Sequence, residues 1–198
     1  MIIMPREECR SYFVELRPYL KTSLVFFAIG IAIGLMIVSR YPGLAGHFED
    51  SVANFIRTFR GLPPLQLAGT IFLNNASKTL LAITLGALFG VIPGVFLLTN
   101  GVALGVVFTL AAQSKGLWLS LLSILPHGGI ELPGVFLGTS IGLLVGNQAL
   151  KMLRRRSDAA LMFELKRGIR FFCAVIVPLL LVAAFVEAFV TATLISPY

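Results

Sequence analysis

The chain has 198 residues, of which 57% are hydrophobic and 13% are charged. Soluble domains carry about 25% charged residues, so this composition excludes a soluble globular domain, a disordered chain and a disulfide-bonded secreted scaffold. The formal net charge is +7. Cytoplasmic loops of membrane proteins collect Lys and Arg, so this positive charge does not indicate nucleic acid as a partner. The sequence therefore predicts an all-α polytopic membrane protein that forms a single membrane domain over residues 1–198.

The N-terminal segment, residues 1–21, interleaves acidic and basic side chains. This pattern predicts a short helix on the cytoplasmic surface and not a cleaved signal peptide. The apolar stretch that follows, Thr22–Ser39, has about 18 residues and nearly crosses a hydrocarbon core of about 30 Å. We interpret this stretch as a retained signal anchor and as the first transmembrane helix.

The segment 40–72 is rich in polar, proline and glycine residues, which predicts a loop outside the membrane. Within it, apolar side chains recur at helical spacing and charged side chains fill the opposite face. The apolar positions are Val52, Phe55, Ile56 and Phe59. This pattern is typical of an amphipathic helix on the membrane surface, which we expect over Phe48–Arg60.

The second predicted span, Asn75–Leu98, contains Pro93, which removes a backbone hydrogen bond and predicts a kink. Residues 99–101 form a turn signal, and Asn100 is expected at this inner turn, because asparagine tolerates a left-handed backbone. The next apolar stretch, Val102–Leu125, is interrupted by a short polar segment. We expect its second half to be bent or to lie at the membrane interface.

The second half of the chain contains two more predicted spans. Residues 126–129 break the apolar pattern before the fourth span, Ile130–Gly146. A basic segment, residues 147–170, separates this span from the last one, Phe171–Leu194, which is expected to kink at Pro178.

The basic segment sets the orientation, because cytoplasmic loops collect Lys and Arg. Arg154, Arg155 and Arg156 therefore face the cytoplasm, where they either bind lipid headgroups or serve topology alone. The count of crossings agrees with a cytoplasmic N-terminus only if residues 102–125 cross once. We predict about five transmembrane helices in the cell (plasma) membrane, some kinked or broken, plus the surface amphipathic helices.

Glycine recurs at four-residue spacing in three predicted spans, and this spacing lets helix backbones approach closely. The positions are Gly30 and Gly34, then Gly86, Gly90 and Gly94, then Gly134, Gly138, Gly142 and Gly146. Two interpretations stay open. One is packing of the second span on the fourth within the chain, and the other is a homodimer seam, for which the pair in the first span is the best candidate.

Polar side chains in apolar spans are costly unless they pair or face a cavity. The predicted topology gathers several of them toward the outer leaflet. They are Asn75, Lys78, His127, Glu131 and Glu187. Among them, Glu131 is expected in the first turn of a helix, where the helix dipole favours a carboxylate.

The pair His127 and Glu131 allows three interpretations: a polar staple that locks a broken helix, an ion- or proton-handling site, or a metal site. Two ligands fall short of a zinc set. Because no nucleophile–base pair accompanies them, we expect a protein that is not an enzyme and that holds no metal or cofactor.

The polar positions of the central region resemble those of the stage II sporulation protein M family. The matching residues are Asn74-Asn75, Asn100-Gly101 with Gly105, and His127-Gly128 followed by Glu131-Leu-Pro133. The resemblance is strong over Asn74–Gly146 and extends over most of the chain by hydropathy. It implies about five spans and a cytoplasmic N-terminus, and it carries over Asn75, Asn100, His127 and Glu131 as the polar positions of interest.

The resemblance also implies a function. The family member of sporulating bacteria is similar to a scaffold that recruits a septal peptidoglycan-degrading complex and has no known catalysis of its own. By analogy we expect a membrane scaffold or assembly factor, whose partners are the lipid bilayer, other membrane or cell-envelope proteins and, in one interpretation, a second copy of the chain. The alternative is a small transporter or channel with an outer-leaflet polar site around His127 and Glu131.

Overall fold

The computed structural model describes residues 4–41, 43, 46, 62–155 and 159–191, and within these it leaves out the side chains of residues 122–128, 130, 154–155, 159 and 190–191. The elements of the described part are all helices. In chain order they are α1 (Arg6–Arg40), α3 (Pro64–Thr84), the 3-10 turn η1 (Leu85–Ala87), α4 (Val91–Lys115), α5 (Leu117–Arg155), α6 (Ala159–Phe171), the π-helical turn η2 (Phe172–Ile176), α7 (Val177–Val186) and the π-helical turn η3 (Glu187–Thr191). The amphipathic helix expected over Phe48–Arg60 lies outside the described residues.

Three helices of the described part are long and apolar enough to cross a membrane. They are Arg6–Arg40, Val91–Lys115 and Ala160–Phe189, the last running from α6 into η3. The chain is therefore helical and membrane-like, as the composition predicts, while the count of five crossings stays a prediction.

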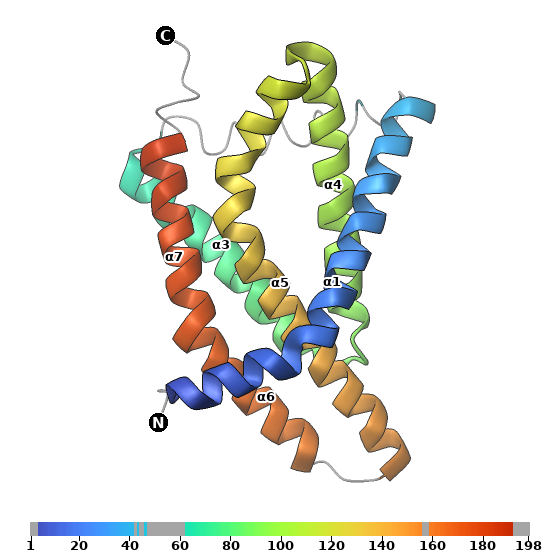
Figure 1. The fold of residues 1–198 in the computed structure, drawn as a ribbon, viewed down its shortest axis with the longest axis vertical. Coiled ribbons are helices and arrows are strands. Elements are labelled where there is room, and N and C mark those ends of the chain that lie inside the picture. The colour runs from blue at the N-terminus through green and yellow to red at the C-terminus, as the bar shows by residue number, and fades with distance from the viewer. Residues whose placement is uncertain (1–3, 42, 44–45, 47–61, 156–158, 192–198) are drawn as a thin grey trace.

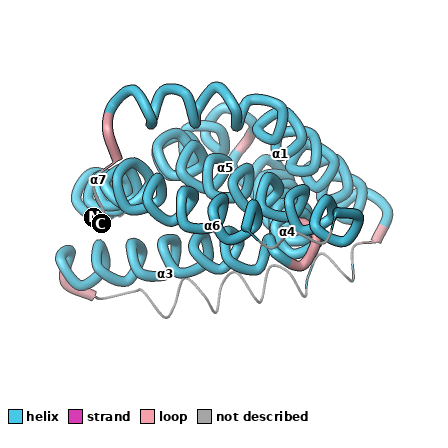
Figure 2. Tube along the Cα trace, turned by 90° about the horizontal axis from the view of Figure 1, so that it is seen from below, coloured by secondary structure: helices cyan, strands magenta, loops and turns pink. Residues whose placement is uncertain are grey.

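The long helices run between two ends of the molecule, which we call the lower and upper ends (Figure 1). The start of α1, the α3–α4 connection, the end of α5 and the start of α6 lie toward the lower end. The end of α1, the α4–α5 connection and η3 lie toward the upper end. In the view from below, α3 lies on one side of α5, α6 and α7, and the first half of α1 crosses on the other side (Figure 2).

The predicted second span is wrong, because the chain reverses within it. α3 ends at Thr84, and α4 begins at Val91 after Phe89 and Gly90 adopt positive φ angles of 57° and 75°. Pro93 is therefore the third residue of α4 and not the site of a kink, and its missing N–H costs no helical bond in a first turn.

The inner turn expected at Asn100 is also wrong. Asn100 lies within α4, and its side-chain amide donates a hydrogen bond to the Phe96 carbonyl oxygen at 2.7 Å. A residue with this bond stays inside the helix, so the turn signal of residues 99–101 is overridden by the apolar residues on both sides.

The break expected at residues 126–129 is likewise wrong, because α5 is a continuous helix of 39 residues. The chain reverses earlier, at Gly116, whose φ is 84°. The stretch Val102–Leu125 is thus divided between the end of α4 and the start of α5. A membrane helix tolerates proline, because neighbouring groups satisfy the freed carbonyls.

The last span departs from a regular helix one turn before Pro178. Residues Phe172–Ile176 form the π-helical turn η2, and Pro178 then occupies an early position of α7. Because π-turns are a common cause of helix bending, the irregularity predicted for this span is present but precedes the proline.

The largest hydrophobic core of the described residues joins the first half of α1 to α3, α5, α6, η2 and α7. Its buried members include Tyr12, Leu16, Ile83, Ile141, Val145, Phe171, Ile176 and Leu180. This core fixes the N-terminal half of α1 against the rest of the bundle.

Candidate functional site

The crossing of α1 and α4 is built on two glycine pairs that face each other. Gly30 and Gly34 lie against Gly101 and Gly105. A methyl group added to Gly30 would lie 2.5 Å from the carbonyl oxygen of Leu98, so the two backbones are in direct contact. Gly101 and Gly105 also have four-residue spacing in the sequence, although they are not among the spaced glycines predicted to pack helices.

The crossing of α3 and η1 with α5 uses small residues in the same way. Gly138 lies against Thr79, Gly142 against Ala82 and Gly86, and Gly146 against Gly90. Gly134 and Gly94 instead lie against large side chains, those of Leu180 and Phe26 respectively. The spacing of Gly86, Gly90 and Gly94 is thus not a stripe on one helix, since the chain reverses between them.

These contacts bear on the homodimer interpretation. The face of α1 that carries Gly30 and Gly34 is covered by α4 of the same chain. A dimer seam on this face would require α4 to move away, and dimer formation itself stays a prediction.

Buried hydroxyl groups join α1 to α5. Ser23 and Ser140 are fully buried with their Oγ atoms 3.2 Å apart, and the Thr139 hydroxyl lies 3.4 Å from Ser23 Oγ. The Thr139 and Ser140 hydroxyls also donate to the carbonyl oxygens of Val135 and Phe136 at 2.8 and 2.5 Å. The polar atoms of this crossing therefore satisfy one another.

The polar cluster expected at the outer leaflet is spread over several environments. Asn75 is half-buried and its Oδ1 accepts a bond of 3.3 Å from Asn74, whereas Lys78 is exposed and lines a groove of about 200 Å³. The groove is otherwise lined by Leu81, Ala82, Leu85, Ile92 and Phe96. Glu187 is half-buried at the start of η3, which contacts α3 and α5.

Glu131 does not lie in the first turn of a helix, so the expectation that a helix dipole stabilises its carboxylate is wrong. It lies about a third of the way along α5, half-buried, with its Oε2 atom buried. His127 is one turn earlier in the same helix, and its side chain lies outside the described set. Within the described ranges, no group of three His, Cys, Asp or Glu side chains is placed to hold a metal ion.

Two of the three arginines of the basic segment are placed by the structure. Arg154 and Arg155 belong to the last turn of α5 and Arg156 lies outside the described residues.

The joint between the first half of α1 and α6 is a site that the sequence analysis missed. Its centre is Tyr12, which is fully buried. The ring of Tyr12 meets Phe171 edge-on at 5.2 Å, and the Arg167 guanidinium lies over it at 4.3 Å. Glu164, Arg167 and Phe171 lie on one face of α6, where residues three, four and seven apart are neighbours.

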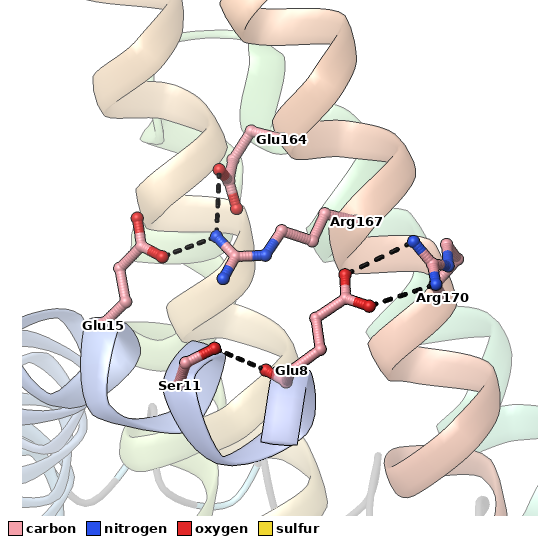
Figure 3. Close-up of polar contacts among 6 residues, drawn as sticks. All are labelled: Glu8, Ser11, Glu15, Glu164, Arg167 and Arg170. Atoms are coloured by element: carbon pink, nitrogen blue, oxygen red, sulfur yellow. Dashed lines mark hydrogen bonds and ion pairs between the residues drawn. The ribbon is translucent and has the colours of Figure 1, made fainter. Parts of the chain in front are cut away.

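Ion pairs link α1 to α6 at this joint (Figure 3). Arg167 bonds Glu15 of α1 at 2.6 Å and lies 3.9 Å from Glu164. Arg170 contacts both carboxylate oxygens of Glu8, at 3.2 and 3.3 Å. Acidic residues of α1 thus face basic residues of α6, and this opposition is the signal by which the sequence could have revealed the joint.

Glu164 is the least exposed charged group of the joint, at 3%. It lies in the charged part of α6, before the apolar stretch of the last span. Burial raises the pKa of Glu164, and the opposing effects of the Tyr12 hydroxyl and Arg167 do not cancel this rise. Burial and the nearby Glu164 in turn raise the pKa of Tyr12, so the tyrosine stays neutral.

Glu164→Gln should stabilise the folded protein relative to wild type, and this difference should grow as the pH rises. The pKa of the Glu164 carboxyl is raised in the folded state. Its contribution to folding stability is therefore fully present below the unfolded pKa of about 4.3, and it is lost as the pH rises through the folded pKa. We expect the variant to melt above wild type at about pH 8, with a difference that shrinks toward about pH 4. Thermal unfolding in detergent measures this.

The matched control for that variant is Glu15→Gln, in a side chain that is 42% exposed. It should give no gain in melting temperature at alkaline pH. A Glu164→Gln variant that melts below wild type at alkaline pH would contradict the assignment of a strained buried charge.

An all-helical chain with three membrane-length apolar helices and closely packed small-residue crossings is a helical membrane protein. Residues 23–192 match the family model described as Stage II sporulation protein M. The match covers most of the chain, so the protein belongs to the Stage II sporulation protein M family, and the family predicted from the sequence is confirmed. No curated protein and no solved structure matches it.

Proposed function

We propose that the protein is a non-enzymatic scaffold or assembly factor of the plasma membrane, which holds partner proteins of the membrane or cell envelope. The observation that carries this proposal is the direct backbone contact at the α1–α4 and α3–α5 crossings. Helices in such contact lose packing when they slide or separate. A fixed frame suits a protein that positions others better than one that alternates between two open states.

The proposed orientation places the lower end in the cytoplasm and lets the chain cross the bilayer five times. Support comes from charge. Basic residues of the lower end are Arg6, Arg10, Arg17, Lys21, Lys151, Lys166, Arg167 and Arg170, against Arg40 and Lys115 toward the upper end. Positive charge on this scale belongs on the cytoplasmic side.

The transporter alternative has less support. The hydroxyl groups inside the α1–α5 crossing bond one another, and Lys78 is exposed beside an apolar groove lining. A transport pathway near the bilayer midplane needs polar groups that line water.

Two measurements together test the scaffold proposal. A photo-crosslinking amino acid at Phe163, which is 65% exposed at the lower end, should give discrete protein adducts in cells of the source organism. The same probe at Val25, 56% exposed in the apolar stretch, should give lipid adducts. Purified protein in liposomes should conduct protons no faster than empty liposomes.

The proposal fails if liposomes show flux that Glu131→Gln abolishes while that variant stays monodisperse in detergent. It fails equally if Phe163 gives lipid adducts and no protein adducts.

A further inference from the structure

A groove of about 400 Å³ opens at the surface between α1, the α3–α4 connection and α5. Its lining residues are Pro18, Tyr19, Thr22, Phe89, Gly90, Leu143, Asn147 and Leu150. The proposed scaffold role does not involve this groove. The groove lining contains neither Glu131 nor the arginines at the end of α5.

The middle of the groove is polar. Asn147 Nδ2 donates a hydrogen bond to the Tyr19 hydroxyl oxygen at 2.7 Å, which ties α5 to α1. Because the Tyr19 hydroxyl accepts this bond, its own hydrogen can be donated elsewhere, as can the second amide hydrogen of Asn147. Two neighbouring side chains of the groove thus each keep a donor for an anionic oxygen.

Three basic residues neighbour the lining residues in the sequence. Lys21 precedes Thr22 in α1, Lys151 lies one turn beyond Asn147 in α5, and both lysines are exposed. Arg17 adjoins Pro18 on the same helix. The groove lining contains no carboxylate, so its net field attracts an anion.

The groove also lies where the charged part of α1 gives way to its apolar stretch. Thr22 begins the apolar stretch of α1, so charged residues flank the groove on one side and apolar residues on the other. Phe89 and Leu150 are 46% and 45% exposed and present apolar surface beside the polar centre. Basic pockets between helices on the cytoplasmic side are known sites for anionic lipid headgroups.

We propose that this groove binds the glycerophosphate headgroup of an anionic phospholipid from the inner leaflet. The Tyr19 hydroxyl and the Asn147 amide donate to the phosphate oxygens, Lys21 and Lys151 supply the countercharge, and the first acyl carbons pack on Phe89. The proposal uses the proposed orientation to name the leaflet, but it does not depend on the scaffold role.

Native mass spectrometry of the detergent-purified protein tests this site, with dioleoyl phosphatidylglycerol and dioleoyl phosphatidylcholine as probes. Phosphatidylglycerol should bind more tightly. Each lysine near a membrane surface contributes about fivefold in affinity, so Lys21→Gln with Lys151→Gln should weaken it about 25-fold. Binding of phosphatidylcholine should not change.

A matched control removes the same charge elsewhere. Lys115→Gln with Lys166→Gln, both in exposed lysines outside the groove, should leave phosphatidylglycerol binding within about twofold of wild type. Tyr19→Phe, which keeps the ring and removes one donor to a charged acceptor, should weaken binding about tenfold. Unchanged melting temperature of each variant without added lipid shows that the fold is intact.

Three outcomes overturn the proposal. The first is wild-type phosphatidylglycerol binding in the Lys21 and Lys151 double variant. The second is displacement of the lipid by excess inorganic phosphate, which assigns the site to a free anion. The third is loss of binding only when Arg154, Arg155 and Arg156 are neutralised, which assigns lipid binding to the basic segment. None of them affects the crosslinking test of the scaffold role.

Discussion

Gly101→Ala should destabilise the protein by about 2–3 kcal/mol, although alanine is the better helix former by about 1 kcal/mol. The new methyl group would collide with the carbonyl oxygen of Phe27 and lie 3.0 Å from the Cα of Gly30. Both are backbone atoms, which cannot rotate aside as a side chain does. The helices α1 and α4 must therefore separate, and the contacts along the whole crossing weaken together.

The matched control is Gly94→Ala in the same helix. Gly94 is also buried, but its added methyl would meet only the ring of Phe26, at 3.9 Å. That distance is an ordinary contact, so the helix propensity of alanine should dominate and raise stability by up to about 1 kcal/mol. Unfolding of both variants by SDS titration in mixed micelles measures the difference. Equal effects of the two substitutions would show that backbone contact is not what holds the crossing.

Composition and hydropathy sufficed for the class of protein, because lipid imposes a helical, apolar chain. They did not suffice for the path of the chain between Asn75 and Leu98. A reversal built from apolar residues and glycines leaves no polar signal in the sequence, and the positive φ angles of Phe89 and Gly90 are invisible to hydropathy. The same limit explains α5, where Pro126 and two glycines suggest a break that continuous helical hydrogen bonding overrides.

The joint around Tyr12 was missed for a different reason. Its halves are far apart in the sequence, and each half alone has a simpler explanation, a surface helix and a basic loop. Only the complementarity between Glu8 and Glu15 on one side and Arg167 and Arg170 on the other points to a contact. Side-chain packing decides which of many acidic and basic residues meet, and local spacing carries no information about it.

Arg167→Met should lower the free energy of unfolding by about 2–4 kcal/mol, because it leaves the buried Glu164 without a cation. Arg167 is itself only 16% exposed and holds α1 through Glu15. Methionine keeps much of the volume, and its sulfur packs on the Tyr12 ring in place of the guanidinium. The loss should therefore report charge more than shape, and it should weaken the attachment of the first half of α1 to α6.

The control is Glu8→Gln, which breaks the other ion pair of the joint. The side chains of Arg170 and Glu8 are 36% and 30% exposed, so this pair should contribute less than about 1 kcal/mol. The decisive variant combines Arg167→Met with Glu164→Gln. Removing both members of a buried pair is often nearly neutral, so at least half of the stability lost in Arg167→Met should return. A double variant as unstable as Arg167→Met alone would mean that packing on Tyr12, and not the buried charge, makes Arg167 necessary.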